Sequence, residues 1–135
     1  MGDGGDLAYV DTSAFLKLLG SEPESALVVE AIDSTWPHLV ASEILAVESF
    51  RAALLLGGEA PAEVTRLLNL VALQPLSREI RDSACRIAPP RLRTLDAIHL
   101  ATAISLDRRI GAIFTYDKRL AEASADAGLQ VLAPA

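Results

Sequence analysis

The sequence predicts an α/β protein in which a parallel sheet of about five strands is covered by helices on both faces. Short apolar segments, of the length of buried strands, alternate along the chain with longer segments whose apolar residues recur at helical spacing. Gly, Pro, Ser and Asp separate these segments, and such residues often begin and end helices. This alternation is typical of parallel strands, because parallel neighbours need a crossover connection long enough to hold a helix.

Five apolar segments are short enough to be buried strands. They cover Leu7–Val10, His38–Ala41, the residues near Leu73, Ala112–Thr115 and Gln130–Leu132. Polar or turn-forming residues bound these segments, as is typical of strands. The whole chain, residues 1–135, is expected to form one domain, with a flexible tail at residues 1–6.

The segments between the strands are expected to be helices. They cover Thr12–Leu19, Pro23 to about Asp33, Ser42 to Gly57, Ala60–Val71, Ser77 to about Ala88, Thr94 to about Asp107 and Asp117–Ala127. Ser42 and Thr94 have hydroxyls that suit the N-cap position, and Pro23 suits the first turn of a helix. The pairs Gly57–Gly58 and Pro89–Pro90 each end a helix, because glycine adopts the left-handed cap conformation and proline cannot continue a helix.

Composition excludes several classes of protein. A chain that is 51% hydrophobic and 22% charged is not intrinsically disordered. No apolar stretch approaches the roughly 20 residues of a membrane span, and the N-terminal MGDGGD lacks the basic start and apolar middle of a signal peptide. The single cysteine, Cys85, excludes an internal disulfide and a cysteine-based zinc site. These observations favour a cytoplasmic protein without a membrane partner.

The charges are distributed unevenly along the chain, whose net charge is −6. Residues 1–77 hold three basic and eleven acidic side chains, whereas residues 78–119 hold nine basic and five acidic ones. The net negative charge by itself argues against a nucleic-acid partner, but the basic second half is compatible with a polyanion bound on one side. Solvated helix faces would give the same pattern for most of these arginines.

Four acidic residues occupy positions that a structural role does not easily explain together. Asp11 directly follows the first strand and Asp117 the fourth, so both carboxylates lie at one edge of the sheet if those strands are neighbours. Glu48 and Asp96 lie on expected helices and have apolar residues at helical spacing, so both are expected to face inward. Acidic side chains are almost never fully buried unless paired, and no lysine or arginine shares these faces.

A divalent cation would relieve the repulsion within such a cluster. Mg²⁺ and Mn²⁺ prefer oxygen ligands and usually keep water or substrate phosphate in their remaining positions.

Taken singly, three of the acids also have structural explanations. Asp11 and Asp117 can cap helices, and Asp96 is favourable in a first helical turn. Glu48, in the middle of a helix, has no routine structural role.

Four segments of the chain resemble the sequence blocks of the PIN-domain nucleases, in particular the VapC-type toxins of bacterial toxin–antitoxin pairs. In chain order they are YVDTSAFLKLL, LVASEILAVESFRAAL, LRTLDAIHLATA and IFTYDKRLAEASADAGLQVLAP. The blocks place the family's acids at Asp11, Glu48, Asp96 and Asp117, with Thr115 in the last block. The resemblance covers nearly the whole chain and implies a three-layer α/β/α sandwich around the parallel sheet.

The resemblance also implies an activity and partners. It implies an endoribonuclease that depends on one or two Mg²⁺ or Mn²⁺ ions, cleaves RNA such as tRNA or rRNA, and forms a homodimer. A small VapB-type antitoxin would occlude the site and point a basic side chain at the acids. We expect the antitoxin to pack in a groove beside an apolar stripe on the second helix, formed by Leu27, Val28, Ala31 and Ile32.

Several polar residues near the acids have two interpretations. Thr12, Ser13 and Thr115 can hold waters or support the acids, or they can be plain helix caps. Arg91 and Arg93 flank the site on a proline-rich loop, where they can contact RNA phosphates or simply be solvated.

Two further residues near the acids are interpreted as structural. Glu43 is a rival for the second acid, but it lies roughly 140° around the helix from Glu48, in the first turn, where the helix dipole favours it. His99 lies one turn after Asp96. It is conceivable as a general acid, but a buried, hydrogen-bonded core histidine is the favoured interpretation.

Three alternative functions remain open from the sequence. A phosphatase with a nucleophilic aspartate would use Asp11 and Mg²⁺, but it needs a second aspartate two positions later, where this chain has Ser13. A phospho-acceptor signalling domain would need a pair of acids at the end of the first strand, where this chain has one. A PIN domain that binds partners without catalysis is the third alternative, and the presence of all four acids argues against it.

Overall fold

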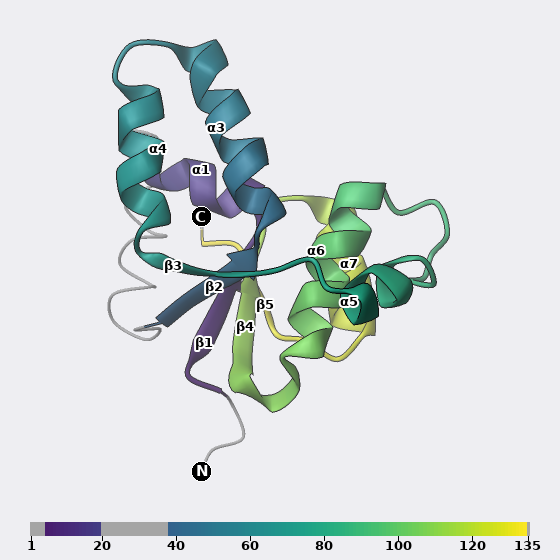
Figure 1. Cartoon of the computed structure of the whole chain (residues 1–135). Helices are drawn as coiled ribbons and strands as arrows, with labels where there is room; N and C mark the ends of the chain where they lie inside the picture. The colour runs from purple at the N-terminus through teal and green to yellow at the C-terminus, as the bar shows by residue number, and fades with distance from the viewer. Residues whose placement is uncertain (1–4, 20–37, 135) are drawn as a thin grey trace.

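The structure, a computed structural model, describes residues 5–19 and 38–134 (Figure 1). The strands are β1 (Leu7–Val10), β2 (His38–Ser42), β3 (Val71–Gln74), β4 (Ile110–Phe114) and β5 (Val131–Leu132). The helices are α1 (Thr12–Leu16), α3 (Ile44–Leu56), α4 (Ala60–Leu68), α5 (Arg78–Ala84), α6 (Thr94–Ser105) and α7 (Lys118–Asp126), with 3-10 helices at Lys17–Leu19 and Asp107–Arg109. None of the helices in these ranges is long and apolar enough to cross a membrane. The expected helix from Pro23 to about Asp33, with its apolar stripe, lies outside the described residues.

The strands form one parallel sheet in the order β3-β2-β1-β4-β5. The chain builds outward from β1 through β2 to β3 and then crosses to the other side of β1 to add β4 and β5. The direction of winding therefore reverses between β1 and β4, and in open α/β sheets ligands bind at the carboxyl ends of the strands beside such a point. Asp11 and Asp117 follow these two strands, and because β1 and β4 are paired, both acids lie at the same edge of the sheet.

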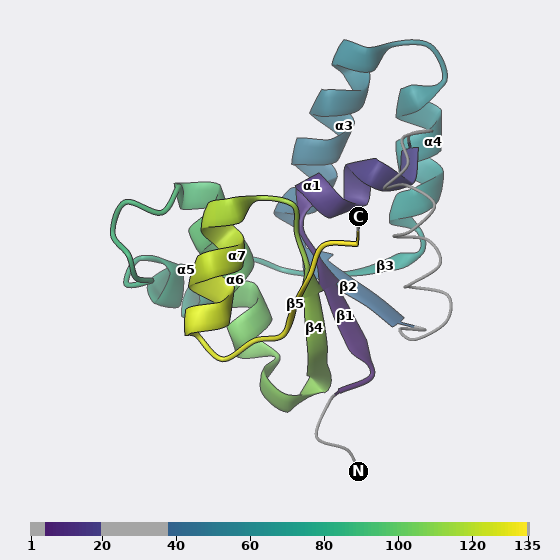
Figure 2. The same cartoon turned by 180° about the vertical axis from the view of Figure 1, so that it is seen from behind.

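Helices cover both faces of the sheet, which confirms the predicted three-layer α/β/α sandwich. Ala8 and Val10 of β1 belong to a core that includes Phe15 of α1 and Leu45 of α3, whereas Tyr9, between them, packs with Ala103 of α6. Figures 1 and 2 show α1, α3 and α4 on one side of the sheet and α5, α6 and α7 on the other. A strand buried on both faces needs apolar residues at successive positions, which explains the uninterrupted LAYV of β1.

Ser42 and Thr94 do not occupy N-cap positions, so both predictions were wrong. Ser42 is the last residue of β2, and Glu43 occupies the N-cap position of α3. The strand is longer than expected because β2 pairs with β3 up to this residue. The Ser42 hydroxyl still accepts a hydrogen bond from the Ile44 N–H at 3.2 Å. At the start of α6 the N-cap position belongs to Arg93, whose side chain makes no capping bond.

Three helices end earlier than predicted. α1 ends at Leu16 and is followed by the first 3-10 helix. α4 ends at Leu68, and Val71, which was expected to belong to it, lies in β3 opposite Leu39 of β2. α5 ends at Ala84. Val71 belongs to a strand because it pairs with a distant strand, and local apolar spacing contains no information about that pairing.

The described part of the chain begins at Gly5, within the expected tail of residues 1–6. Gly5 lies against the backbone of Arg108 and Arg109, so closely that an added Cβ would fall 1.8 Å from the Arg109 carbonyl oxygen. The chain therefore needs a glycine here, immediately before it enters β1.

Candidate active site

A cleft of about 320 Å³ opens at the carboxyl ends of β1 and β4. The four acids expected to form a site come from four separate elements, and all of them line this cleft: Asp11, Glu48, Asp96 and Asp117. The remaining lining residues are Thr12, Ser13, Arg93, Thr94, Leu95 and His99. The structure thus brings together acids from the loop after β1, the middle of α3, the first turn of α6 and the N-cap of α7.

Asp11 is the most deeply buried of the four acids, with 3% of its surface exposed. Its Oδ1 accepts hydrogen bonds from the Ala14 N–H at 2.9 Å and the Ser13 hydroxyl at 2.8 Å, and its Oδ2 accepts one from the Thr115 hydroxyl at 2.5 Å. Burial raises the pKa of Asp11, and these hydrogen bonds oppose the rise. Asp11 is therefore the N-cap of α1 and at the same time a carboxylate held at the cleft.

Two hydroxyl groups join the loop after β4 to the loop after β1. The Thr115 hydroxyl donates to Asp11 and accepts a hydrogen bond from the Asp117 N–H at 3.0 Å. The Ser13 hydroxyl also donates to Asp11 and accepts from the Tyr116 N–H at 2.8 Å. Asp117 then caps α7 through its Oδ1. These hydroxyls fix the relative positions of two acids that come from opposite ends of the sequence.

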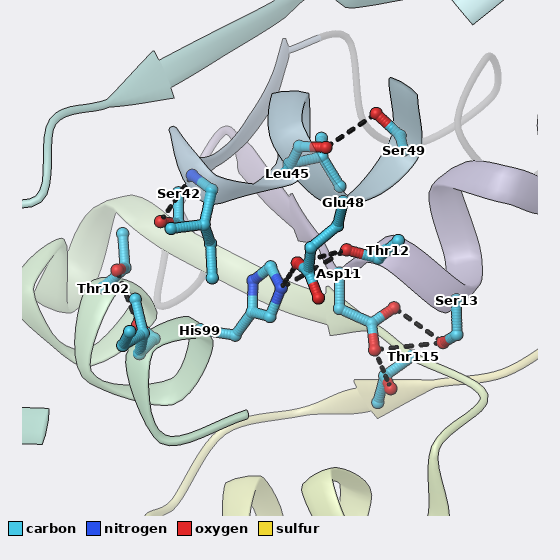
Figure 3. A network of polar contacts seen from close by, with 12 residues as sticks. Asp11, Thr12, Ser13, Ser42, Leu45, Glu48, Ser49, His99, Thr102 and Thr115 are labelled. Carbon is cyan, nitrogen blue, oxygen red and sulfur yellow. Dashed lines mark hydrogen bonds and ion pairs between the residues drawn. The ribbon is translucent and has the colours of Figure 1, made fainter. Parts of the chain in front are cut away.

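Glu48 is held through one of its two oxygens (Figure 3). Its Oε1 accepts hydrogen bonds from the Thr12 hydroxyl at 2.6 Å and from His99 Nε2 at 2.9 Å. Burial raises the pKa of Glu48, but the hydrogen bonds from His99 and Thr12 outweigh burial, so the pKa is lowered overall. His99 is itself buried, and its Nδ1 lies 2.6 Å from the Tyr9 hydroxyl. His99 is therefore a buried, hydrogen-bonded histidine, as predicted, and it contacts one of the four acids.

Asp96 differs from the other three acids because its carboxylate accepts no hydrogen bond from any described residue. Burial raises its pKa, and the charges of Asp117 and Asp11 raise it further, whereas His99 and Arg93 act in the opposite direction. An acid that is repelled by its neighbours and has free lone pairs is one that a bound cation would stabilise.

The donor set fits a hard divalent cation. In the described ranges, no three His, Cys, Asp or Glu side chains are arranged to chelate one ion directly. Asp11 accepts hydrogen bonds on both oxygens, Glu48 on Oε1 and Asp117 on Oδ1, so Asp96 and the second oxygens of Glu48 and Asp117 are the donors least used by described residues. Mg²⁺ usually binds through one or two carboxylates and retains several waters, so it does not require direct contact with all four acids. Oxygen donors without any thiolate favour Mg²⁺ or Mn²⁺ over softer metals.

Glu43 does not line the cleft. It is exposed, and its Oε2 accepts a hydrogen bond from the Leu76 N–H at 2.5 Å. This contact ties the start of α3 to the segment after β3, so Glu43 has a structural contact in place of a position at the site.

The two arginines expected to flank the acids lie in different hollows. Arg93 lines the carboxylate cleft, whereas Arg91 lines a larger hollow of about 670 Å³ together with Arg119 of α7. None of these three guanidinium groups forms an ion pair or hydrogen bond within the described residues. Sequence reasoning missed Arg119, because nothing in its local pattern distinguishes it from a solvated residue of an amphipathic helix.

Comparison with known proteins agrees with this architecture. The PIN domain family model matches residues 8–126, and the chain therefore belongs to the PIN-domain family. Ribonuclease VapC46 of Mycobacterium tuberculosis is 38% identical over 126 residues, which cover 93% of this chain and 96% of that protein.

Two solved structures share the fold. The crystal structure of Mycobacterium tuberculosis VapC20, described as a sarcin-ricin loop cleaving toxin, has a TM-score of 0.70 at 18% identity and covers 94% of this chain and 99% of its own. A toxin–antitoxin complex from Klebsiella pneumoniae has a TM-score of 0.68 at 21% identity, with 83% of this chain and 88% of the other covered.

Proposed function

We propose that this protein is an endoribonuclease toxin that hydrolyses phosphodiester bonds of tRNA or rRNA and is neutralised by a cognate antitoxin. The observation that supports this proposal most strongly is that four carboxylates from four separate elements line one cleft. The cleft lies at the point where the sheet reverses its winding. The naming of its relative VapC46 as a ribonuclease supports the assignment of RNA as the substrate.

Mg²⁺ or Mn²⁺, as one or two ions, is the proposed cofactor. Asp96 and the free oxygen of Glu48 are the most accessible ligands, and Asp11 and Asp117 complete the site. When bound, the cation supplies a water of lowered pKa and a positive charge beside the phosphate. Hydrolysis by in-line attack would leave a 3′-hydroxyl and a 5′-phosphate. Thr12, Ser13 and Thr115 are proposed to keep the carboxylates in position through the hydrogen bonds that they donate.

The environment of Asp11 favours a nuclease over an aspartate-based phosphatase. Both oxygens of Asp11 accept hydrogen bonds, and its exposed fraction of 3% leaves little access for a phosphate that would have to be attacked. Ser13, at the position where such a phosphatase needs a second aspartate, donates one of these hydrogen bonds. Asp11 is thus held as a fixed carboxylate at the cleft and is poorly placed to act as a nucleophile.

RNA is proposed to reach the acids over a rim of arginines. Arg93 lies at the cleft itself, and Arg91 and Arg119 line the separate, larger hollow, which Glu122 and Asp126 also line. Arg66 and Arg81 each pair with an acid nearby, whereas these three lack such a partner within the described residues. Unpaired guanidinium groups beside an acidic centre can bind the phosphates on either side of the one that reacts.

Protein partners are proposed from the family and from an exposed apolar face. Four large apolar residues of α3 are between 57% and 91% exposed: Val47, Leu54, Leu55 and Leu56. Exposed apolar patches commonly mark protein interfaces. We expect a homodimer and a VapB-type antitoxin, and we place their activity in the cytoplasm, where tRNA and rRNA are found. The groove expected beside the second helix stays a prediction, because that helix lies outside the described residues.

The direct test is to incubate the purified protein with total RNA, with and without Mn²⁺, and to map new 5′ ends by sequencing. We expect cleavage at few sites, only with the ion, and none with the Asp96→Asn variant. Cleavage that persists in EDTA, or that is equal in the variant, would contradict the assignment.

A further inference from the structure

Tyr9 and His99 form a buried chain of hydrogen bonds that leads to Glu48. The Ser42 N–H donates to the Tyr9 hydroxyl at 3.1 Å, the Tyr9 hydroxyl lies 2.6 Å from His99 Nδ1, and His99 Nε2 lies 2.9 Å from Glu48 Oε1. Tyr9 is completely buried and His99 is 1% exposed. Tyr9 lies on β1 and does not line the carboxylate cleft, so its hydroxyl does not contact a ligand there. Packing does not require a hydroxyl either, so the hydroxyl needs another explanation.

The Glu48 carboxylate can only accept a hydrogen bond, so its contact with His99 requires a proton on Nε2. The Ser42 N–H can only donate, so it uses an acceptor position of the Tyr9 oxygen. The Tyr9 oxygen keeps one further acceptor position and one proton, and the side-chain groups it bonds to are His99 Nδ1, at 2.6 Å, and the Thr102 hydroxyl. In a ring that carries a single proton on Nε2, Nδ1 has no proton and can only accept, so the Tyr9 hydroxyl donates to it. Nε2–H then donates to Glu48.

We propose that Tyr9 and His99 are positioning residues for the site: Tyr9 holds His99 as the Nε2–H tautomer, and His99 thereby holds Glu48 with one oxygen free for a ligand. The opposite tautomer would direct the Nε2 lone pair at Glu48 Oε1, and the two would repel each other. Glu48 would then keep only the hydrogen bond from Thr12 and lose its fixed orientation. The last step, that the free oxygen binds a metal, rests on the proposed function.

The tautomer can be tested without any catalytic reaction. The chain contains two histidines, His38 and His99, so the ¹⁵N spectrum of the His38→Gln variant reports on His99 alone. Where the ring carries one proton, we expect that proton on Nε2 and an unprotonated Nδ1 in the metal-free protein. A singly protonated ring with its proton on Nδ1 would overturn the proposal directly.

The second test links the tautomer to the metal site. Tyr9→Phe keeps the ring but removes the donor to Nδ1, so we expect His99 to populate the other tautomer and the Mn²⁺ affinity, measured by calorimetry, to fall about tenfold. Tyr116→Phe removes the hydroxyl of the only other tyrosine, which bonds to the Pro134 carbonyl, and should leave both readouts unchanged. An unchanged Mn²⁺ affinity in Tyr9→Phe would overturn the positioning role.

A third variant separates positioning from loss of packing. His99→Gln places an amide N–H near the position of Nε2, and an amide has no second tautomer. Adding Tyr9→Phe to His99→Gln should then change Mn²⁺ affinity by less than about twofold, whereas the two effects would add if Tyr9 acted only by packing. If wild type bound no Mn²⁺ at all, the proposed function would fail, and the ¹⁵N spectrum of His99 would still decide its tautomer.

Discussion

Thr115 Oγ1 lies 2.5 Å from Asp11 Oδ2, although 104 residues separate the two in the sequence. β1 and β4 are parallel neighbours with Val10 opposite Phe114, so the next residue of each strand meets at the carboxyl edge. The same hydroxyl accepts the Asp117 N–H. One small side chain therefore links two of the four acids.

Replacing Thr115 by Val should weaken the site while the shape of the side chain is kept. The variant loses the donor to Asp11, so the pKa of Asp11 should rise further and the acid should bind a cation less well. We expect the Mn²⁺ affinity, measured by calorimetry, to fall about tenfold. Thr115→Ser keeps the hydroxyl and should remain close to wild type. Equal affinities for the Val and Ser variants would show that the hydrogen bond is unimportant.

Mg²⁺ or Mn²⁺ should raise the melting temperature of the protein, because a ligand that binds only the native state stabilises it. At an ion concentration about a hundredfold above the dissociation constant the gain is about 2.7 kcal/mol, which corresponds to several degrees. Asp96→Asn should remove most of this rise, as should Asp11→Asn. A full rise in both variants, measured by differential scanning fluorimetry, would rule out these acids as ligands.

Glu48→Gln should abolish most of the activity while the protein stays folded. The amide keeps the size of the side chain and an oxygen that can accept from Thr12 and His99, but it removes the charge that a cation requires. Losing one such ligand should slow RNA cleavage on the order of a hundredfold or more. Expressed without antitoxin in a bacterial host, wild type should arrest growth and Glu48→Gln should be tolerated.

Glu43→Gln is the matched control for this substitution. Glu43 is on the same helical segment but outside the cleft, where its carboxylate bonds to the Leu76 N–H. This variant should therefore still arrest growth. The reverse outcome, a harmless Glu43 variant and a toxic Glu48 variant, would mean that Glu43 is the functional acid.

Asp96 and Glu48 should affect the stability of the metal-free protein in opposite ways. Burial and the nearby charge of Asp117 raise the pKa of Asp96. An acid whose pKa is higher in the folded protein than in the unfolded chain contributes its full stabilisation only at a pH below its ordinary pKa. This contribution is lost as the pH rises through the raised pKa of the folded protein. Near neutral pH, Asp96→Asn should therefore be at least as stable as wild type, and the difference should disappear in acid.

For Glu48 the sign is reversed. Burial raises its pKa, but hydrogen bonds from His99 and Thr12 outweigh burial and lower it. Its stabilisation is present at neutral pH and is lost as pH falls through the lowered pKa. Glu48→Gln should thus cost about 1 kcal/mol near pH 7 and less in acid. Urea unfolding at several pH values measures both variants, and a clear loss of stability in Asp96→Asn at pH 7 would make Asp96 a structural cap.

Arg93 and Arg119 should contribute to RNA binding more than to the chemical step. Changing either to Ala should raise KM and leave kcat nearly unchanged, because phosphates away from the reacting one are bound equally before and during reaction. The dependence of log affinity on log salt should become shallower by about 0.7 per arginine removed. Arg66→Ala removes the same charge from α4, where Arg66 pairs with Glu63, and should have neither effect. Equal changes in all three variants would indicate a general effect of net charge.

Much of the fold and the four acids could be predicted from the sequence. Apolar spacing identified the strands within the described ranges because a strand buried on both faces, such as Leu7–Val10, must be apolar at successive positions. The same reasoning identified Glu48, since an acid in the middle of a helix, at helical spacing from apolar residues, needs an explanation. Helix ends were less accurate, because Ser42 and Val71 joined strands only through pairing with distant segments.

The tertiary structure alone decided which of these residues meet. Local patterns report which face of an element is buried, but the neighbours of that face are chosen by packing between segments far apart in the chain. Strand order placed Asp11 beside Thr115, and packing of α6 on β1 placed His99 against Tyr9, 90 residues away in the sequence. Proximity in the sequence also suggested that Arg91 and Arg93 flank the same site, but the two side chains line different hollows. The sequence therefore determined the chemical groups of the site, and long-range packing determined their geometry.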